Sequence, residues 1–155
     1  MPQVLSMNSP VGWLTLVEDD GALTELRFGL PRSEETLQET PLLLEAKHQL
    51  EAYFAGQRKV FDLPLAPKVT AFQQQCWQAL RRIPYGQTCT YAQQAAAIGN
   101  PKACRAVGTG NHANPIPIII PCHRVIGADG RLTGYGGGME IKRKLLLLEG
   151  IELKG

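Results

Sequence analysis

The sequence has few cysteines and few aromatic residues, and it has no hydrophobic run long enough to cross a membrane. Only 4 of its 155 residues are cysteine, and 6% are aromatic. No Cys-x-x-Cys pair occurs, and no histidine lies at a zinc-finger spacing from a cysteine. The N-terminus lacks a basic segment followed by an apolar one, so no signal peptide is expected. These absences disfavour a zinc finger, a disulfide framework and a membrane protein, and they predict reduced thiols in a cytoplasmic protein.

The composition is that of a globular protein whose charge is divided unevenly along the chain. Hydrophobic residues make up 44% and charged residues 19%, which suits one large domain or two small ones. Residues 1–68 contain 6 Lys and Arg against 10 Asp and Glu, whereas residues 69–155 contain 10 against 4. The basic second half predicts an anionic partner, with nucleic acid as the first candidate and chance asymmetry as the alternative.

The first half has the pattern of a small sheet followed by a helix. Residues 3–28 alternate as short strands with a turn at Asp19-Asp20-Gly21, and residues 29–40 are expected to form a loop. Thr40 is a suitable N-cap for a helix that ends at Gly56. Residues 59–63 are predicted to form one more strand, before a linker marked by two prolines.

The second half begins with three helices. Thr70 and Thr90 each have a glutamine three residues later, which is a capping-box pattern, and they predict helices over 71–83 and 91–98. Asn100-Pro101 is expected to start a third helix that runs through about Gly110. The last two have the layout of a helix-turn-helix, with an ordinary αα-hairpin as the alternative. The third helix carries small residues that suit either a groove wall or tight packing inside the protein.

A cysteine and a histidine adjoin the most apolar stretch of the chain. Ile118 to Ile120 read as a buried strand that Pro121 ends, so Cys122 is expected where regular backbone stops. The thiolate is the nucleophile, and the imidazole of His123 could accept the thiol proton. The alternative is a buried cysteine beside a hydrogen-bonded histidine.

A glycine-rich loop and a last helix follow. Residues 134–138 could fold around a flat ligand or serve as a linker. The helix over 140–148 ends at Glu149, where a carboxylate opposes the helix dipole. We therefore expect a partner to hold Glu149 in place.

The segment Pro121-Cys122-His123-Arg124-Val125 resembles the active-site signature of the O6-alkylguanine-DNA alkyltransferases. The resemblance covers residues 70–150 closely and the first part of the chain loosely. It rests jointly on Tyr91, Arg105, Asn114, Cys122, Tyr135 and Glu149, which lie at the family's spacings.

The resemblance implies an α/β fold of two domains. A small ribonuclease H-like domain of sheet and helix, residues 1–68, would have a structural role. A mostly helical domain with a helix-turn-helix, residues 69–155, would bind DNA and transfer the alkyl group. The implied activity is that of a methylated-DNA–[protein]-cysteine S-methyltransferase, a DNA repair enzyme that takes the alkyl group from O6-alkylguanine irreversibly and acts once. O4-alkylthymine is left open as a second substrate.

The resemblance also implies catalytic roles. Cys122 would attack the alkyl carbon, and His123 would act as its base through a bound water. Glu149 would orient His123, and Asn114 would bond to the turn that carries the cysteine. The signature cysteine disfavours a module that only binds lesions, since such relatives carry tryptophan there. A thiol redox protein is disfavoured because no resolving cysteine lies nearby in sequence.

The implied partner is double-stranded DNA that contains alkylated guanine, bound in the minor groove with the base flipped out. Tyr91 would rotate the target phosphate, and Arg105 would take the place of the flipped base. The implied guanine pocket and further DNA contacts comprise Tyr135, Gly136, Gly137, Pro117, Thr90, Ala103 and Lys102. No cofactor or metal is expected, because residues 1–75 lack the zinc ligands of some relatives, and the protein is expected to be a monomer.

Overall fold

The computed structural model describes residues 2–130, 132, 134–135 and 137–152. The chain divides into two units, residues 1–68 and 69–155, and each is described by itself. Among the described residues, no helix is both long and apolar enough to cross a membrane.

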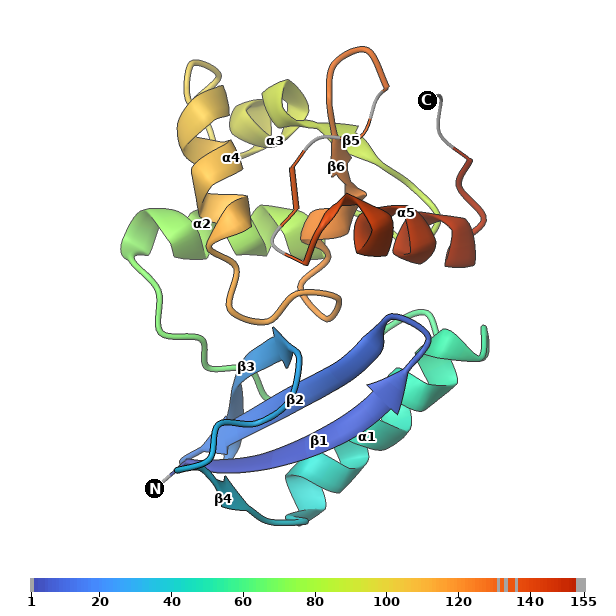
Figure 1. The fold of residues 1–155 in the computed structure, drawn as a ribbon. Coiled ribbons are helices and arrows are strands. Elements are labelled where there is room, and N and C mark those ends of the chain that lie inside the picture. Colours follow the sequence, from blue (N-terminus) through green and yellow to red (C-terminus); the bar gives the residue numbers. More distant parts are fainter. Residues whose placement is uncertain (1, 131, 133, 136, 153–155) are drawn as a thin grey trace. The chain divides into compact units, whose positions relative to one another are not determined.

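The N-terminal unit is a four-stranded sheet with one helix packed on it (Figure 1). The strand order is β3-β2-β1-β4. Strand β2 pairs antiparallel with both β1 and β3, and β4 pairs parallel with β1. The elements are β1 (Gln3–Ser9), β2 (Gly12–Asp19), β3 (Ala22–Phe28), β4 (Thr36–Leu37) and α1 (Pro41–Phe54). This arrangement confirms the predicted sheet-and-helix half.

Helix α1 begins and ends where the sequence predicts. The Thr40 side chain accepts a hydrogen bond from the Leu43 amide, and Gly56 follows the helix with a φ of +74°. Leu43, Ala46 and Leu50 recur at helical spacing and are fully buried. Because the helix contacts β1, β2 and β3, this apolar stripe forms the core of the unit.

Two strand predictions in this unit were wrong. Residues 59–63 form no strand, because the Gln49 side chain bonds to both backbone groups of Asp62, donating at 3.0 Å and accepting at 2.9 Å. Conversely, the expected loop at 29–40 contains β4. A strand of only two exposed residues has no periodicity that a sequence pattern could detect.

The C-terminal unit is mostly helical, with one short parallel pair of strands. Its elements are α2 (Ala71–Arg81), β5 (Cys89–Thr90), α3 (Tyr91–Ala97), α4 (Cys104–His112), the 3-10 helix η1 (Cys122–Arg124), β6 (Val125–Ile126) and α5 (Met139–Leu148). Strands β5 and β6 pair with each other. Helices α2, α3 and α4 contact one another, and η1 lies beside α5 (Figure 1).

The predicted capping boxes at Thr70 and Thr90 are both formed. Helix α4, however, begins at Cys104, later than predicted, because residues 100–103 form a turn closed by a hydrogen bond from the Ala103 amide to the Asn100 carbonyl. Pro101 lies in that turn rather than at the first helical position.

A buried amide pair joins the two helices of the helix-turn-helix. Gln94 of α3 and Asn111 of α4 exchange hydrogen bonds of 2.8 and 2.7 Å, and Gln94 also donates to the Cys76 carbonyl of α2. Buried amides are costly unless they are paired, so this exchange favours one arrangement of the three helices.

One of the two glycines of α4 is explained by packing inside the protein. A Cβ atom on Gly110 would lie only 3.0 Å from the Cys76 sulfur, whereas one on Gly108 would lie 3.7 Å from the Tyr91 ring, an ordinary contact distance. Tight helix packing therefore accounts for Gly110 and not for Gly108.

The predicted strand over Ile118–Ile120 was wrong, although these residues are buried as expected. They form a tight turn in which Ile118 has a φ of +74° and the Ile120 amide bonds to the Ile116 carbonyl. Prolines at 115, 117 and 121 remove the donors that a ladder needs. A run of apolar residues signals burial here but not the kind of backbone.

Candidate active site

Cys122 is the first residue of η1 and is 7% exposed. Burial raises the pKa of its thiol, and hydrogen bonding by Asn114, the charge of Lys142 and hydrogen bonding by Tyr135 offset that effect only in part. The resting thiol is therefore protonated at neutral pH and needs a base to become a nucleophile.

Asn114 fastens the turn that leads to the cysteine. Its amide group donates to the Ile120 carbonyl at 2.8 Å, and its carbonyl accepts from the Ile116 amide at 3.0 Å. The same side chain lowers the pKa of the Cys122 thiol. Asn114 thus bonds to the backbone of the turn, as the resemblance implied.

His123 and Glu149 form a buried pair. The Nε2 atom of His123 lies 2.6 Å from Oε2 of Glu149, and both side chains are fully inaccessible. Since a carboxylate only accepts, the geometry assigns the proton of the neutral imidazole to Nε2 and leaves Nδ1 as the acceptor. Nδ1 has no hydrogen-bond partner within the part of the chain that the structure describes.

The pKa of His123 is lowered, chiefly by burial, although the hydrogen bond and charge of Glu149 oppose this effect. The charges of Arg124 and Lys142 also lower the His123 pKa. At neutral pH the imidazole is therefore uncharged and able to accept a proton.

The sequence prediction missed Arg124 as a partner of Glu149. Its Nε and Nη2 atoms donate to the two carboxylate oxygens at 2.8 and 3.1 Å. The Gly86 amide donates to Oε1 at 3.2 Å. These contacts, together with His123, are the partners expected for a carboxylate at a helix C-terminus. The signal for Arg124 was present in the signature itself, but nothing local distinguishes it from a surface arginine.

Lys142 adjoins Arg143 and Lys144 on α5, yet it is 1% exposed. Burial lowers its pKa to about 8, and the nearby Cys122 thiolate opposes that shift. A buried ammonium that interacts with the thiol favours the thiolate. Its burial depends on the packing of α5 against η1.

The candidate residues for DNA contact lie in two groups. Thr90 is the N-cap of α3 and Tyr91 its first residue, while Lys102, Ala103 and Arg105 lie at the start of α4, where Lys102 and Arg105 are exposed. The second group contains the buried Pro117, the buried Tyr135, which lowers the pKa of the Cys122 thiol, and Gly137 in the turn before α5. The predicted pocket residue Gly136 lies outside the described residues.

Over the described ranges of the chain, no group of three or more His, Cys, Asp or Glu side chains is arranged to hold a metal ion. All four cysteines are free thiols.

Comparison with known proteins decides the family. The model described as "6-O-methylguanine DNA methyltransferase, DNA binding domain" matches residues 71–151, and that described as "6-O-methylguanine DNA methyltransferase, ribonuclease-like domain" matches residues 5–67. The chain belongs to the 6-O-methylguanine DNA methyltransferase family.

Individual members of the family are similar over nearly the whole chain. A methylated-DNA–protein-cysteine methyltransferase of Methanosarcina acetivorans is 52% identical over 147 residues, covering 92% of this chain and 94% of that protein. The constitutive enzyme of Bacillus subtilis is 51% identical over 155 residues, covering 94% of each. The crystal structure of Mycobacterium tuberculosis O6-methylguanine methyltransferase matches with a TM-score of 0.88 at 49% identity, covering 96% of this chain and 93% of that one. The M. tuberculosis OGT structure in complex with DNA has the same TM-score and identity, covering 95% and 92%.

These matches confirm the predicted fold, with its ribonuclease-like first part and its DNA-binding second part. The roles of the individual site residues stay predictions, because likeness of the whole chain does not test them.

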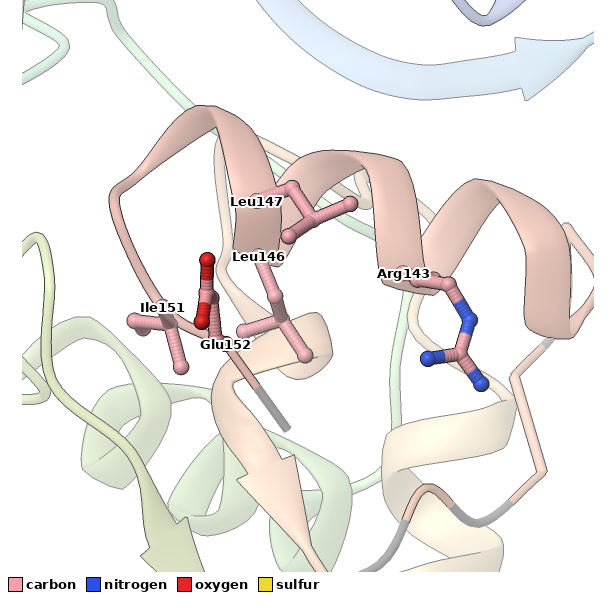
Figure 2. Close-up of a pocket in the computed structure, with 5 residues that line it drawn as sticks. All are labelled: Arg143, Leu146, Leu147, Ile151 and Glu152. Carbon is pink, nitrogen blue, oxygen red and sulfur yellow. The ribbon is translucent and has the colours of Figure 1, made fainter. Parts of the chain in front are cut away.

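The helix that precedes Glu149 also lines a pocket of about 230 Å³. Figure 2 shows the lining residues, with Leu146 and Leu147 on α5, Ile151 and Glu152 just after it, and Arg143 about one turn earlier on the helix. Among the residues that the structure describes, no predicted site residue lines this pocket.

Proposed function

We propose that this protein reverses O-alkylation of guanine in DNA by moving the alkyl group to Cys122. The observation that carries the proposal is a buried thiol next to a histidine whose Nε2 atom is held 2.6 Å from a buried carboxylate, in a chain of this family. That arrangement leaves Nδ1 of His123 as a base beside a nucleophile that needs one.

In the proposed reaction the Cys122 sulfur forms a bond to the alkyl carbon while the bond from that carbon to guanine O6 breaks. The thiol proton passes through a water to Nδ1 of His123, and the electron pair of the broken bond stays on the guanine, which then takes up a proton. Glu149 stabilises the imidazolium that forms. The thioether is not hydrolysed, so each protein molecule acts once.

The proposed DNA contacts follow the helix-turn-helix. Helix α4 would lie in the minor groove, with Arg105 inserted in place of the flipped base and Tyr91 at the target phosphate. The exposure of Lys102 and Arg105 supports this assignment, because side chains that reach DNA must be accessible. Thr90 and Ala103 flank these residues.

The flipped guanine would enter a pocket lined by Tyr135, Gly136, Gly137 and Pro117. Tyr135 supports this placement because it is buried and acts on the pKa of the Cys122 thiol, so a base held by Tyr135 would lie close to the sulfur.

The division of labour is part of the proposal. Residues 69–155 would bind DNA and carry the reaction, and residues 1–68 would have a structural role. The four free thiols support a location in the reducing cytoplasm.

The test is the mass of the intact protein after exposure to duplex DNA that contains O6-methylguanine. We expect a gain of one methyl group per molecule, with the guanine restored. Tight binding of the modified DNA without a mass change would instead indicate a lesion-binding module. Peroxide-induced disulfide formation without alkyl transfer would indicate a redox protein.

A further inference from the structure

Arg124 is placed to control the charge of the buried pair formed by His123 and Glu149. Its guanidinium contacts both oxygens of Glu149 side-on, at 2.8 and 3.1 Å, and its Nη1 atom donates to the Ile83 carbonyl at 2.7 Å. The carbon of the guanidinium lies 5.8 Å from the centre of the Tyr85 ring. The residue is 6% exposed, so its charge is poorly screened by water.

Arg124, Glu149 and His123 form a cluster whose net charge is zero only because the arginine is present. Arginine is always protonated in proteins, so Arg124 and the Glu149 carboxylate cancel, and a neutral His123 completes an uncharged cluster. When the Cys122 proton moves to His123, the thiolate and the imidazolium cancel as well. With Arg124 present, activation of the thiol is therefore a proton transfer inside the site with no change of net charge.

We propose that Arg124 is a positioning residue of the transfer reaction, which neutralises Glu149 and so keeps Nδ1 of His123 free to accept the thiol proton. This role rests on the proposed function of Cys122. It goes beyond the implied roles of His123 and Glu149, because it makes the state of the base depend on a third buried side chain.

Without the guanidinium, the same pair would bind one more proton. A carboxylate that is buried without a countercharge is costly, and the pair can cancel it only by protonating His123 or Glu149. A protonated Glu149 would donate to Nε2, so in both cases Nδ1 would carry the proton. Nδ1 could then no longer act as a base, and forming the thiolate would require loss of a proton to solvent.

Three other titratable groups act on this cluster. Lys142 acts on His123 and on Cys122, and it remains mostly charged below its pKa of about 8. Burial and the charge of Glu149 raise the pKa of Tyr85, so its hydroxyl stays neutral at the pH values of interest. Cys122 is protonated there because burial raises its pKa. Between pH 6.5 and 7.5 only a minor fraction of Lys142 loses its charge, so most of the pH dependence there reports the proton on His123 and Glu149.

The experiment compares single-turnover transfer from O6-methylguanine DNA in the full-length protein with that in Arg124→Met and Arg124→Lys. The unchanged protein should transfer at nearly the same rate across the window. Arg124→Met should be slower, with a rate that rises by up to tenfold per pH unit, because one proton must leave before the thiolate forms. Arg124→Lys, which keeps the charge and loses the planar fork, should be slower but flat in pH.

A second readout does not depend on the reaction. Nitrogen chemical shifts of His123 in labelled protein should report a proton on Nε2 alone in the unchanged protein and in Arg124→Lys, and a proton on Nδ1 at pH 7 in Arg124→Met. If Arg124→Met does not fold, Arg124→Gln removes the charge and keeps hydrogen-bond donors.

Equal loss of rate at every pH, together with unchanged His123 shifts in the Met or Gln variant, would overturn the proposal and leave Arg124 a structural role. Failure of the proposed function would look different, because the unchanged protein would then transfer no alkyl group while its His123 shifts would still report the tautomer.

Discussion

Two arginines of the C-terminal unit, Arg105 on α4 and Arg124 in η1, lie in opposite surroundings. Arg105 is exposed at the start of a helix, whereas Arg124 is buried and holds Glu149 with two hydrogen bonds. Water and salt screen the first charge, so it suits attraction of a phosphate backbone. The second charge is buried and poorly screened, so it influences whether neighbouring groups bind a proton. It therefore suits control of a base. In the proposed roles, the same residue type would thus serve recognition in one region and chemistry in the other.

The largest effect is expected at the Cys122 sulfur, which we propose receives the alkyl group. Cys122→Ala should abolish transfer while leaving DNA binding nearly intact, because the thiol is small and buried. Peptide mass mapping of the unchanged protein should find one alkyl group, on Cys122. Transfer that persists in the variant, or alkyl found on Cys76, Cys89 or Cys104, would contradict this assignment.

Removing the carboxylate tests the buried region alone. Glu149→Gln should slow transfer by a factor on the order of ten to a thousand, in the range of acid–base effects. It should also raise the apparent pKa of Cys122, because the imidazolium loses its stabilising charge. Rate profiles against pH for both proteins decide the matter, and superimposed profiles would exclude Glu149 from activation of the thiol. Thermal unfolding is the control, since Arg124 would be left buried with an uncompensated charge.

Removing Arg105 tests the exposed region alone. Arg105→Ala should slow repair of duplex DNA by about ten- to a hundredfold, because flipping a base costs a few kcal/mol that the inserted side chain helps to offset. Reaction with free O6-benzylguanine needs no flipping and should be nearly unchanged. Lys102→Ala, which removes an exposed charge from the turn just before the same helix, is the matched control. Equal losses on both substrates would assign Arg105 to the chemistry or the fold.

The smallest effect on rate, less than about tenfold, is expected from Lys142, and it should be accompanied by a gain in stability. The folded-state pKa of Lys142 is about 8, below its ordinary value of 10.5, so the unfolded chain binds more protons between these values. The free energy of unfolding should therefore rise with pH across that window. Lys142→Met should lack this rise and should be more stable at pH 7, by on the order of 1 to 3 kcal/mol. Urea unfolding at pH 7, 8 and 9.5 measures this, and parallel pH dependence in both proteins would contradict it.

Much of the local structure follows from the sequence because its causes are local. Thr40, Thr70 and Thr90 cap their helices as predicted, since a capping side chain bonds to an amide only a few residues away. The predictions failed where contacts with residues distant in the sequence determined the backbone conformation. The Gln49 side chain hydrogen-bonds to the backbone of Asp62, where a strand was predicted. A turn that contains Ile118 stands in place of the second predicted strand.

The chemistry of the site divides in the same way. The sequence by itself predicted the nucleophile and its base, because Cys122 and His123 lie in a signature that resembles that of the family, whereas the adjacent pair alone left an inert buried cysteine open. It also singled out Glu149, because a carboxylate at a helix C-terminus needs a partner.

Only the tertiary structure decided which charges share the buried site. Glu149 lies 26 residues after His123 in the sequence, and Gly86 and Ile83 approach the cluster from a separate loop. Arg124 and Lys142 look like surface cations until η1 and α5 pack together and exclude water from both. Burial depends on contacts between distant segments, and burial is what turns these charges into determinants of where a proton resides.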